Sequence, residues 1–507
     1  MFVEAPKAVG RWITPLVLVA SVAAAAADLR LVDAVKNRDR AAARTLLTQK
    51  IDVTIAQPDG ATALHWAAHW DDLETADLLI RAQAPVNAAN DFGVTPLSLA
   101  CTNGSAAMVD KLLKAGANPN AALPSGETPL MTCARSGKVE AVRPLLARGV
   151  DVNVKETSRG QTALMWAAAE GHADVVRLLI DTRADIRATS TDGFTPLLFA
   201  ARKGDLNTAR VLLTAGADVN GAAPDGTTPL VMATIRANQP LAEFLLTQGA
   251  DPNKGPGFTP LHWMAGNYLT ELTDNTSGVL AEDTEWSFLG GLRGEPRLAF
   301  VKLLLAHGAN VNARAESSPQ PYVGGTRRRR GGGTMVGATP FVLAAETNDV
   351  TLMRALLIAG AEPNVATTNN TTPLMVAAGI GYTQGRNKTT QKTALEAAKL
   401  LLELGADVNA VNANGETALH GAAYREHGTD LVQFLADKGA KLNVKTKRGW
   451  TPLVIAEGVM TSAFVIRAPE TVELLRKLGA EPSPPDVIRD QPTIDRLVQE
   501  RERAKKP

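Results

Sequence analysis

The sequence has few aromatic residues, little net charge and only two cysteines. Aromatic residues make up 4% of the chain although hydrophobic residues of all kinds reach 45%, which disfavours one large aromatic core and favours many small, closely packed helices. The 53 Lys and Arg residues almost balance the 52 Asp and Glu residues, so the formal net charge is +1. The chain as a whole therefore lacks the charge that attracts nucleic acid or an acidic membrane.

Beyond its N-terminal region, the sequence lacks an apolar run long enough for a membrane helix. Residues 1–27 differ from the rest, because two basic residues precede an apolar run at 12–22 and the small residues at 23–27 suit a cleavage site. This order predicts a secretory signal peptide over 1–27, the alternative being a disordered, alanine-rich leader. We expect an exported protein without stable membrane insertion, mature from near Asp28, that is periplasmic or, alternatively, secreted.

One pattern recurs along nearly the whole chain, as in DGFTPLLFAARKG at 192–204 and NGETALHGAAY at 414–424. Paired leucines and an ending such as AGADVN follow it. Most successive copies lie 33 or 34 residues apart, and a fixed period near 33 is typical of a solenoid of stacked helical units. The leading threonines are Thr62, Thr95, Thr128, Thr162, Thr195, Thr228, Thr259, Thr339, Thr372, Thr417 and Thr451.

The tetrads TALH at 62–65 and 417–420 and TPLH at 259–262 closely resemble those of ankyrin repeats, and the resemblance extends over roughly residues 28–482. It implies an all-α solenoid with short β-hairpin fingers, built as an ankyrin repeat array of about eleven repeats. The residue types suit such a fold. Threonine caps a helix N-terminus, proline is tolerated beside it, and glycine ends a helix.

The period also divides the chain. Residues 28–58 have the rhythm of two helices without the tetrad, which predicts a degenerate N-terminal capping repeat. The array itself is expected over 59–482, and a charged C-terminal tail over 483–507. Longer spacings predict insertions into the array at 267–297, 313–335 and 380–392.

The insertion at 313–335 contains four consecutive arginines between glycines, whereas the insertion at 267–297 is mainly acidic. Glycine-rich flanks favour a solvated, disordered loop, and a protein-binding finger is the main alternative. Nucleic-acid binding is a weaker hypothesis, because four charges on one loop bind weakly at physiological salt and export would remove that partner. The arginines are Arg327, Arg328, Arg329 and Arg330.

The histidines and cysteines do not predict a catalytic or metal site. His65 and His69 have the i, i+4 spacing of two metal ligands, but no third ligand follows at a suitable distance. Cys101 and Cys133 are predicted to be buried free thiols, because helices stack about 8–10 Å apart and a disulfide needs closer α-carbons. No catalytic motif stands outside the repeat pattern, so we expect no enzyme activity, no catalytic residue, no metal and no cofactor.

The resemblance implies that fingertips and the ends of the first helices form a concave binding face. Arginine and aromatic residues are enriched there, as in protein interfaces, although the fingertip aromatics could instead pack on neighbouring fingers. We predict a monomeric, non-catalytic module that binds a protein partner. The alternatives are a regulatory or scaffolding subunit of a periplasmic enzyme and a secreted, host-directed effector. The predicted contact residues are His69, Trp70, Phe92, Arg135, Arg159, Phe194, Arg202, Lys203, Arg236, Phe258, Tyr424, Arg425 and Trp450.

Overall fold

A computed structural model describes residues 28–266, 292, 294–316, 335–381, 390–425, 428–461, 464–484 and 487. The predicted signal peptide, Arg327 to Arg330 and most of the charged tail lie outside these residues. The chain divides into two compact units, Met1–Pro124 and Ser125–Pro507. In both units, pairs of short antiparallel helices repeat along the chain, which confirms the predicted helical repeat array.

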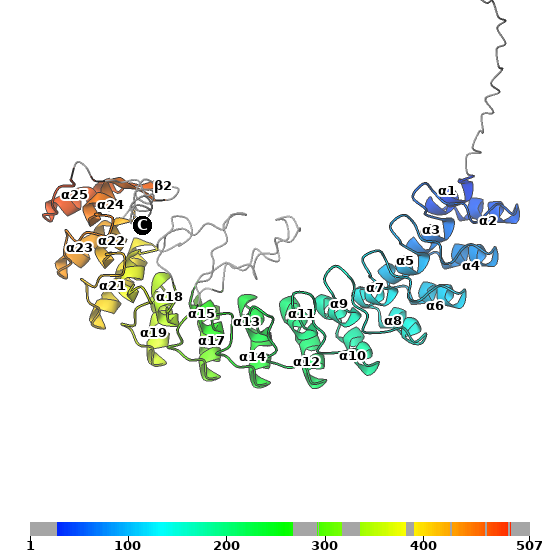
Figure 1. Cartoon of the computed structure of the whole chain (residues 1–507), viewed down its shortest axis with the longest axis horizontal. Helices are drawn as coiled ribbons and strands as arrows, with labels where there is room; N and C mark the ends of the chain where they lie inside the picture. The colour runs from blue at the N-terminus through cyan, green and yellow to red at the C-terminus, as the bar shows by residue number, and fades with distance from the viewer. Residues whose placement is uncertain are drawn as a thin grey trace, which may run out of the picture. The chain divides into compact units, whose positions relative to one another are not determined.

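The first unit contains three helical pairs. The first helices α1, α3 and α5 contact one another in succession, as do the second helices α2, α4 and α6 (Figure 1). Apolar side chains of both rows are buried and helices of successive pairs contact one another, so the core lies between successive repeats. The bounds are α1 (Arg30–Lys36), α2 (Arg40–Thr48), α3 (Ala63–His69), α4 (Leu73–Arg81), α5 (Pro96–Asn103) and α6 (Ala106–Lys114).

The second unit continues the same arrangement with first helices α7, α9, α11, α13, α15, α18, α20, α22 and α24 (Figure 1). The bounds are α7 (Pro129–Ser136), α8 (Val139–Leu146), α9 (Ala163–Glu170), α10 (Ala173–Asp181), α11 (Pro196–Lys203), α12 (Leu206–Thr214), α13 (Pro229–Ile235), α14 (Gln239–Thr247), α15 (Pro260–Ala265), α17 (Gly294–Ala306), α18 (Pro340–Glu346), α19 (Val350–Ile358), α20 (Pro373–Ala378), α21 (Gln391–Glu403), α22 (Ala418–Ala423), α23 (Thr429–Asp437), α24 (Pro452–Gly458) and α25 (Pro469–Lys477).

Strands are scarce in the part of the chain that the structure describes. β1 (Val459–Thr461) and β2 (Phe464–Ile466) pair antiparallel, with Val459 opposite Ile466. The fingers between repeats are tight turns rather than regular hairpins. In the finger at 190–194, for example, the Ser190 N–H donates to the Phe194 carbonyl, and the finger then has no room for further ladder bonds.

The leading threonines begin the first helices as expected. The Thr195 side chain accepts a hydrogen bond of 3.3 Å from the Leu198 N–H, and Pro196 occupies the first helical position. Gly204 ends the same helix with φ 82°, a left-handed conformation that costs other residues energy.

The asparagines of the GADVN-type endings join successive repeats. Asn220, for example, donates from Nδ2 to the Gly249 carbonyl at 3.0 Å, and its Oδ1 accepts from the Asp251 N–H at 2.8 Å. Asn253 and Asn312 make the same pair of bonds to the repeats that follow them. These bonds satisfy polar backbone groups in the turn after each second helix.

The insertion boundaries differ from the prediction at their C-terminal ends. Helix α17 already begins at Gly294, so the end of the predicted insertion at 267–297 is helical. Likewise Thr390 caps α21, which begins at Gln391 inside the predicted insertion at 380–392. Both helices have 13 residues, more than the nine of an ordinary second helix such as α12. The spacing of the repeats gives the number of extra residues, but it does not show whether those residues form a loop or lengthen a helix.

Candidate functional site

Two of the predicted contact residues belong to an aromatic and basic cluster in the first unit. The rings of Trp66 and Trp70 stack with centroids 6.3 Å apart, and the His69 ring meets Trp70 edge-on at 4.4 Å. Lys36 lies 5.0 Å above Trp66 and Arg38 lies 3.9 Å above Trp70, distances at which a cation is attracted to a ring face. We call these five residues the tryptophan cluster.

The tryptophan cluster is held in place by hydrogen bonds within the unit. Trp70 Nε1 donates to the Lys36 carbonyl at 3.0 Å, and Trp66 Nε1 donates to Gln57 at 2.9 Å. Sequence analysis missed Lys36, Arg38 and Trp66, because the first two lie in the capping repeat and Trp66 lies inside α3. Phe92 lies apart on a fingertip and is 70% exposed.

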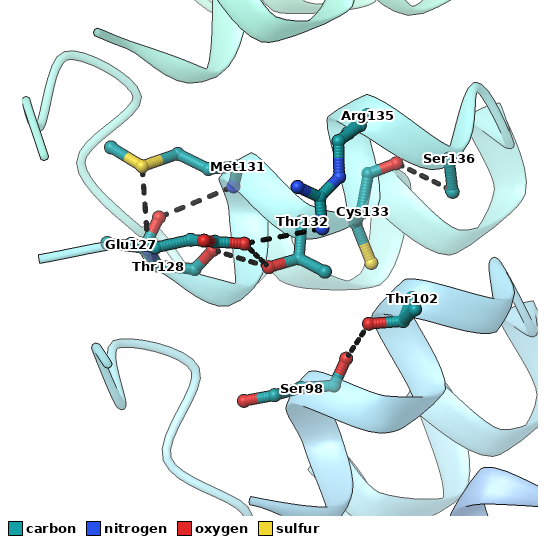
Figure 2. A network of polar contacts seen from close by, with 9 residues as sticks. All are labelled: Ser98, Thr102, Glu127, Thr128, Met131, Thr132, Cys133, Arg135 and Ser136. Atoms are coloured by element: carbon teal, nitrogen blue, oxygen red, sulfur yellow. Dashed lines mark hydrogen bonds and ion pairs between the residues drawn. The ribbon is translucent and has the colours of Figure 1, made fainter. Parts of the chain in front are cut away.

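In the second unit, Arg135 at the end of α7 lies against the next repeat. Its guanidinium is 4.7 Å above the ring of Trp166 on α9. It also lies 3.6 Å from the Glu127 carboxylate, which accepts a hydrogen bond from the Thr132 hydroxyl at 2.9 Å (Figure 2). Arg135 remains exposed in this position. Its charge is therefore partly balanced by an acidic neighbour.

Four cations gather over α9, α11 and the end of α13, and we call them the basic surface: Arg159, Arg202, Lys203 and Arg236. Burial lowers the pKa of Arg202, and the neighbouring charges of Arg159 and Arg236 lower this pKa further, while Glu170 opposes the shift. Lys203 lies 4.0 Å from the Glu170 carboxylate, and both side chains are solvent-exposed.

Aromatic rings support the basic surface from below. The Arg202 guanidinium lies 5.2 Å above the Phe199 ring, and the half-buried Phe194 lies 5.7 Å from the same ring. Arg159 and Lys203 are exposed, whereas Arg202 and Arg236 are half-buried. Six of the predicted contact residues thus lie on the first-helix side of the second unit between α7 and α13. They are Arg135, Arg159, Phe194, Arg202, Lys203 and Arg236.

Two fingertip aromatics were wrongly expected on an exposed face. Phe258 is 2% exposed and packs beside His262 and Trp263, with ring centroids 5.1 and 5.7 Å away. Trp450 is fully buried, and Arg448 lies 5.1 Å from its ring. Both rings are thus buried. The two rings beside Phe258 belong to its own repeat, whereas the expected alternative was packing on a neighbouring finger.

Arg425 was also wrongly expected at the surface. It is 6% exposed, and its guanidinium donates to the carbonyls of Ala377 and Ala378 at the end of α20. Tyr424 is half-buried, and burial raises the pKa of its phenol, with Glu416 adding to the shift. Arg425 therefore offers no open contact surface, whereas Tyr424 keeps part of its surface exposed.

The predicted free thiols are also wrong, because Cys101 and Cys133 are both disulfide-bonded. The prediction used the distance between helix axes, but α-carbons lie about 2.3 Å from their axis, so facing residues can approach far more closely. Within the described ranges no cluster of three His, Cys, Asp or Glu side chains could hold a metal ion. No described helix is both long and apolar enough to cross a membrane.

The tetrad histidines have structural partners. The His420 ring contacts the Thr417 hydroxyl at 2.9 Å through Nδ1 and the Trp450 carbonyl at 3.2 Å through Nε2. Burial lowers the pKa of His420 to about 4. His262 makes the same contacts to Thr259 and to the Ala338 carbonyl, and burial lowers its pKa to about 4 as well. These histidines are thus neutral links between repeats.

A family model described as "Ankyrin repeats (3 copies)" matches residues 31–122, 73–156, 112–190, 130–223, 197–274 and 389–486. These overlapping matches together cover more than half of the chain. The solved ankyrin repeat domain of human ASB11 is similar to this chain, with 27% sequence identity and a TM-score of 0.39. The similarity covers 44% of this chain and 98% of that chain.

Curated relatives are similar over shorter segments. Ankyrin repeat and SOCS box protein 16 of Homo sapiens is 36% identical over 110 residues, which cover 21% of this chain and 21% of that protein. Transient receptor potential cation channel subfamily A member 1 of Homo sapiens is 30% identical over 145 residues, 29% of this chain and 11% of that protein. Alpha-latrocrustotoxin-Lt1a of Latrodectus tredecimguttatus is 32% identical over 128 residues, 25% of this chain and 8% of that protein. The chain thus spans about a fifth or less of these relatives.

Proposed function

The chain belongs to the ankyrin repeat family, and from this premise we propose that it is a non-catalytic module that binds a protein partner through the first-helix side of its second unit. The observation that carries the proposal is the basic surface with its aromatic support. Arg202 lies over Phe199, and the neighbouring charges of Arg159 and Arg236 act on it. Arginine and aromatic side chains of this kind supply most of the binding energy in protein interfaces.

The tryptophan cluster supports a second contact region on the first unit. Its two indole rings are fixed by hydrogen bonds, so these side chains would lose little entropy on binding. His69 is exposed and Trp70 is half-buried, and both therefore retain surface that a partner can cover. We propose that the cluster contributes to the same function.

We also propose that the protein is exported to the periplasm. The order of basic, apolar and small residues in 1–27 supports export, as does the disulfide-bonded state of Cys101 and Cys133, since disulfides persist in oxidising compartments. N-terminal sequencing of the protein from the periplasmic fraction should give a start near Asp28. An intact Met1 on exported protein would rule the signal peptide out.

Crosslinking in the native compartment, followed by affinity capture and identification, tests the proposed function. The capture should be repeated with the double variant Arg202→Ala/Lys203→Ala and with Arg177→Ala. Arg177 is exposed on α10, in the other row of helices, so its replacement is a control for loss of charge away from the basic surface. A partner that is lost with the double variant and kept with Arg177→Ala supports the proposal. A partner kept equally by all three proteins contradicts it.

A further inference from the structure

Asparagine is followed directly by glycine at three places in the chain, 103–104, 220–221 and 414–415. Asparagine loses its side-chain amide most readily before glycine, because glycine has no Cβ to hinder the approach of its backbone nitrogen to the asparagine side chain. The nitrogen attacks Cγ, so the asparagine amide must be free to leave its hydrogen bonds and the backbone must be free to move. The three pairs differ in both respects.

The pairs at 103–104 and 220–221 are held by bonds to a neighbouring repeat. Asn103 donates from Nδ2 to the carbonyls of Ala68 and His69 at 3.0 and 2.8 Å. Asn220 both donates to and accepts from the repeat that follows it, at 3.0 and 2.8 Å. Deamidation at either position must first break two side-chain bonds between repeats. It then leaves a carboxylate beside carbonyl oxygens that have lost their donor.

The amide of Asn414 is held far less firmly. Its side chain is exposed at a fingertip, and among the described residues the amide makes one long hydrogen bond, from Nδ2 to Glu416 at 3.4 Å. The Gly415 N–H donates to the Asn412 carbonyl at 2.9 Å within the same turn. The Asn414 carbonyl accepts from the Lys447 N–H of the next, exposed fingertip at 2.8 Å. Opening this tip therefore breaks backbone bonds at the surface and separates no packed helices.

The same turn already holds the product of deamidation at other fingertips. Asp59, Asp192 and Asp225 occupy the position of Asn414, three residues before a leading threonine and directly before a glycine. Those three glycines have φ between 76° and 90°, and Gly415 has φ 80°. In all four turns the glycine N–H donates to the carbonyl three residues earlier. An aspartate at position 414 therefore fits the turn.

From these differences we propose that Asn414 is a site of spontaneous deamidation in the folded protein, and that Asn103 and Asn220 are protected by their bonds between repeats. The deprotonated nitrogen of Gly415 attacks Cγ of Asn414, a C–N bond forms, and the side-chain nitrogen takes up a proton and leaves as ammonia. Water then opens the succinimide ring to give aspartate or isoaspartate. The fingertip gains one negative charge next to Glu416. The inference is independent of the proposed function.

Peptide mapping of the full chain tests the inference. The purified protein is incubated at neutral and at mildly alkaline pH, and fragment mass spectra locate each amide that has become an acid. In the folded protein Asn414 should react at least about tenfold faster than Asn103 or Asn220, because exposed turns open far more often than packed repeats separate. The rate at Asn414 should rise with pH, since the Gly415 nitrogen reacts after it loses its proton.

Asn369 provides a matched control in the same experiment. It occupies the same fingertip position as Asn414, but Asn370 follows it in place of glycine. Asn370 has φ 60° and makes the same turn bond, to the Thr367 carbonyl at 2.9 Å. Asn369 should remain an amide, because the side chain of Asn370 hinders the attack. In denaturant the three asparagines before glycine should react at rates within about threefold of one another, since no repeat then protects any of them.

Two variants complete the test. Asn414→Gln should abolish the acid at this position, and Asn414→Asp should unfold at the denaturant concentration of the wild type, as expected for a turn that accepts aspartate. Equal rates at Asn414 and Asn220 in the folded protein would overturn the inference. So would an Asn414 that stays an amide in the folded protein while it reacts in denaturant.

Discussion

The Nε group of Arg425 donates a hydrogen bond of 2.8 Å to the backbone carbonyl of Ala378, the last residue of α20. An insertion follows α20. Arg425 lies just beyond the end of α22, the first helix of the next repeat, and its side chain reaches the end of α20. Arg297 does the same at α15, which also precedes an insertion, by donating to the carbonyls of Ala265 and Gly266. In both repeats a buried guanidinium satisfies the helix-end carbonyls that the interrupted turn leaves open.

Replacing Arg425 by alanine should therefore destabilise the protein. The change removes the donor to the Ala378 carbonyl, and a buried carbonyl left without a donor costs about 1–3 kcal/mol. We expect the free energy of unfolding to fall by about 1–3 kcal/mol in denaturant titration. The exposed Arg467 provides a control, since Arg467→Ala should change it by less than about 0.5 kcal/mol. Equal effects of the two changes would mean that Arg425 does not cap α20.

The paired leucines of the second helices should differ in their contribution to stability. Leu212 is fully buried in α12, whereas Leu213 is half-buried. Leu212→Ala should cost about 2–5 kcal/mol because it leaves a cavity among packed helices, and Leu213→Ala should cost about half of that or less. Calorimetric unfolding of the two variants measures the difference. A cost for Leu212→Ala below about 1 kcal/mol would contradict the packing described here.

Sequence predicts the helices well because their signals are local. The threonine before each first helix, the proline after it and the glycine at its end act within a few residues, as Thr195, Pro196 and Gly204 demonstrate. The orientation of surface side chains is not local. Phe194, Phe258 and Trp450 share one position before a leading threonine, yet the first is half-buried and the other two are buried. The repeat pattern does not show which of these rings turns inward.

The candidate site was predictable to the same extent. Arg202 and Lys203 follow from their position at the end of a first helix, although Asn103 at the equivalent position of α5 bonds to the preceding repeat. Arg425 occupies a similar position but turns inward, since the interrupted helix α20 offers it unsatisfied carbonyls. Lys36 and Arg38 belong to the tryptophan cluster but lie in the capping repeat, which lacks the tetrad. No repeat position therefore indicated them.

Acid should destabilise the fold through the buried histidines. His262 and His420 have a pKa of about 4 in the folded chain, below the ordinary value of 6.5, because burial disfavours the charged ring. The buried sites fit the neutral ring. The stability that depends on this neutral form is therefore fully present above pH 6.5 and is lost as pH falls towards 4. Each histidine should contribute a slope of about 1.4 kcal/mol per pH unit in this range.

Unfolding titrations at several pH values, with His420→Gln as the comparison, measure this slope. The variant should be less stable at neutral pH, because glutamine does not reproduce both contacts of the ring. The pH dependence of its free energy of unfolding should also be smaller than that of the wild type by about the contribution of one histidine. A wild-type stability that stays constant between pH 6.5 and 4 would contradict the neutral, buried state.

Thiol titration should find no free cysteine before reduction. Cys101 and Cys133 are both disulfide-bonded and fully buried, so denatured, unreduced protein should not react with a thiol reagent. After reduction, two thiols per chain should react. Removing the bond by Cys101→Ser/Cys133→Ser should lower the unfolding midpoint, since a disulfide typically stabilises by about 2–4 kcal/mol. Two reactive thiols in unreduced protein from its native compartment would show that the bond does not form there.

The central claim is that the basic surface, rather than the arginine-rich finger, holds the partner. The dissociation constant of the purified partner for the wild type, for Arg202→Ala/Lys203→Ala and for a variant with serine at Arg327 to Arg330 tests it most directly. The double variant should bind at least about tenfold more weakly, equivalent to about 1.4 kcal/mol, while the finger variant should keep its affinity within about threefold. Normal binding by the double variant, together with loss of binding by the finger variant, would contradict the account and assign recognition to the finger.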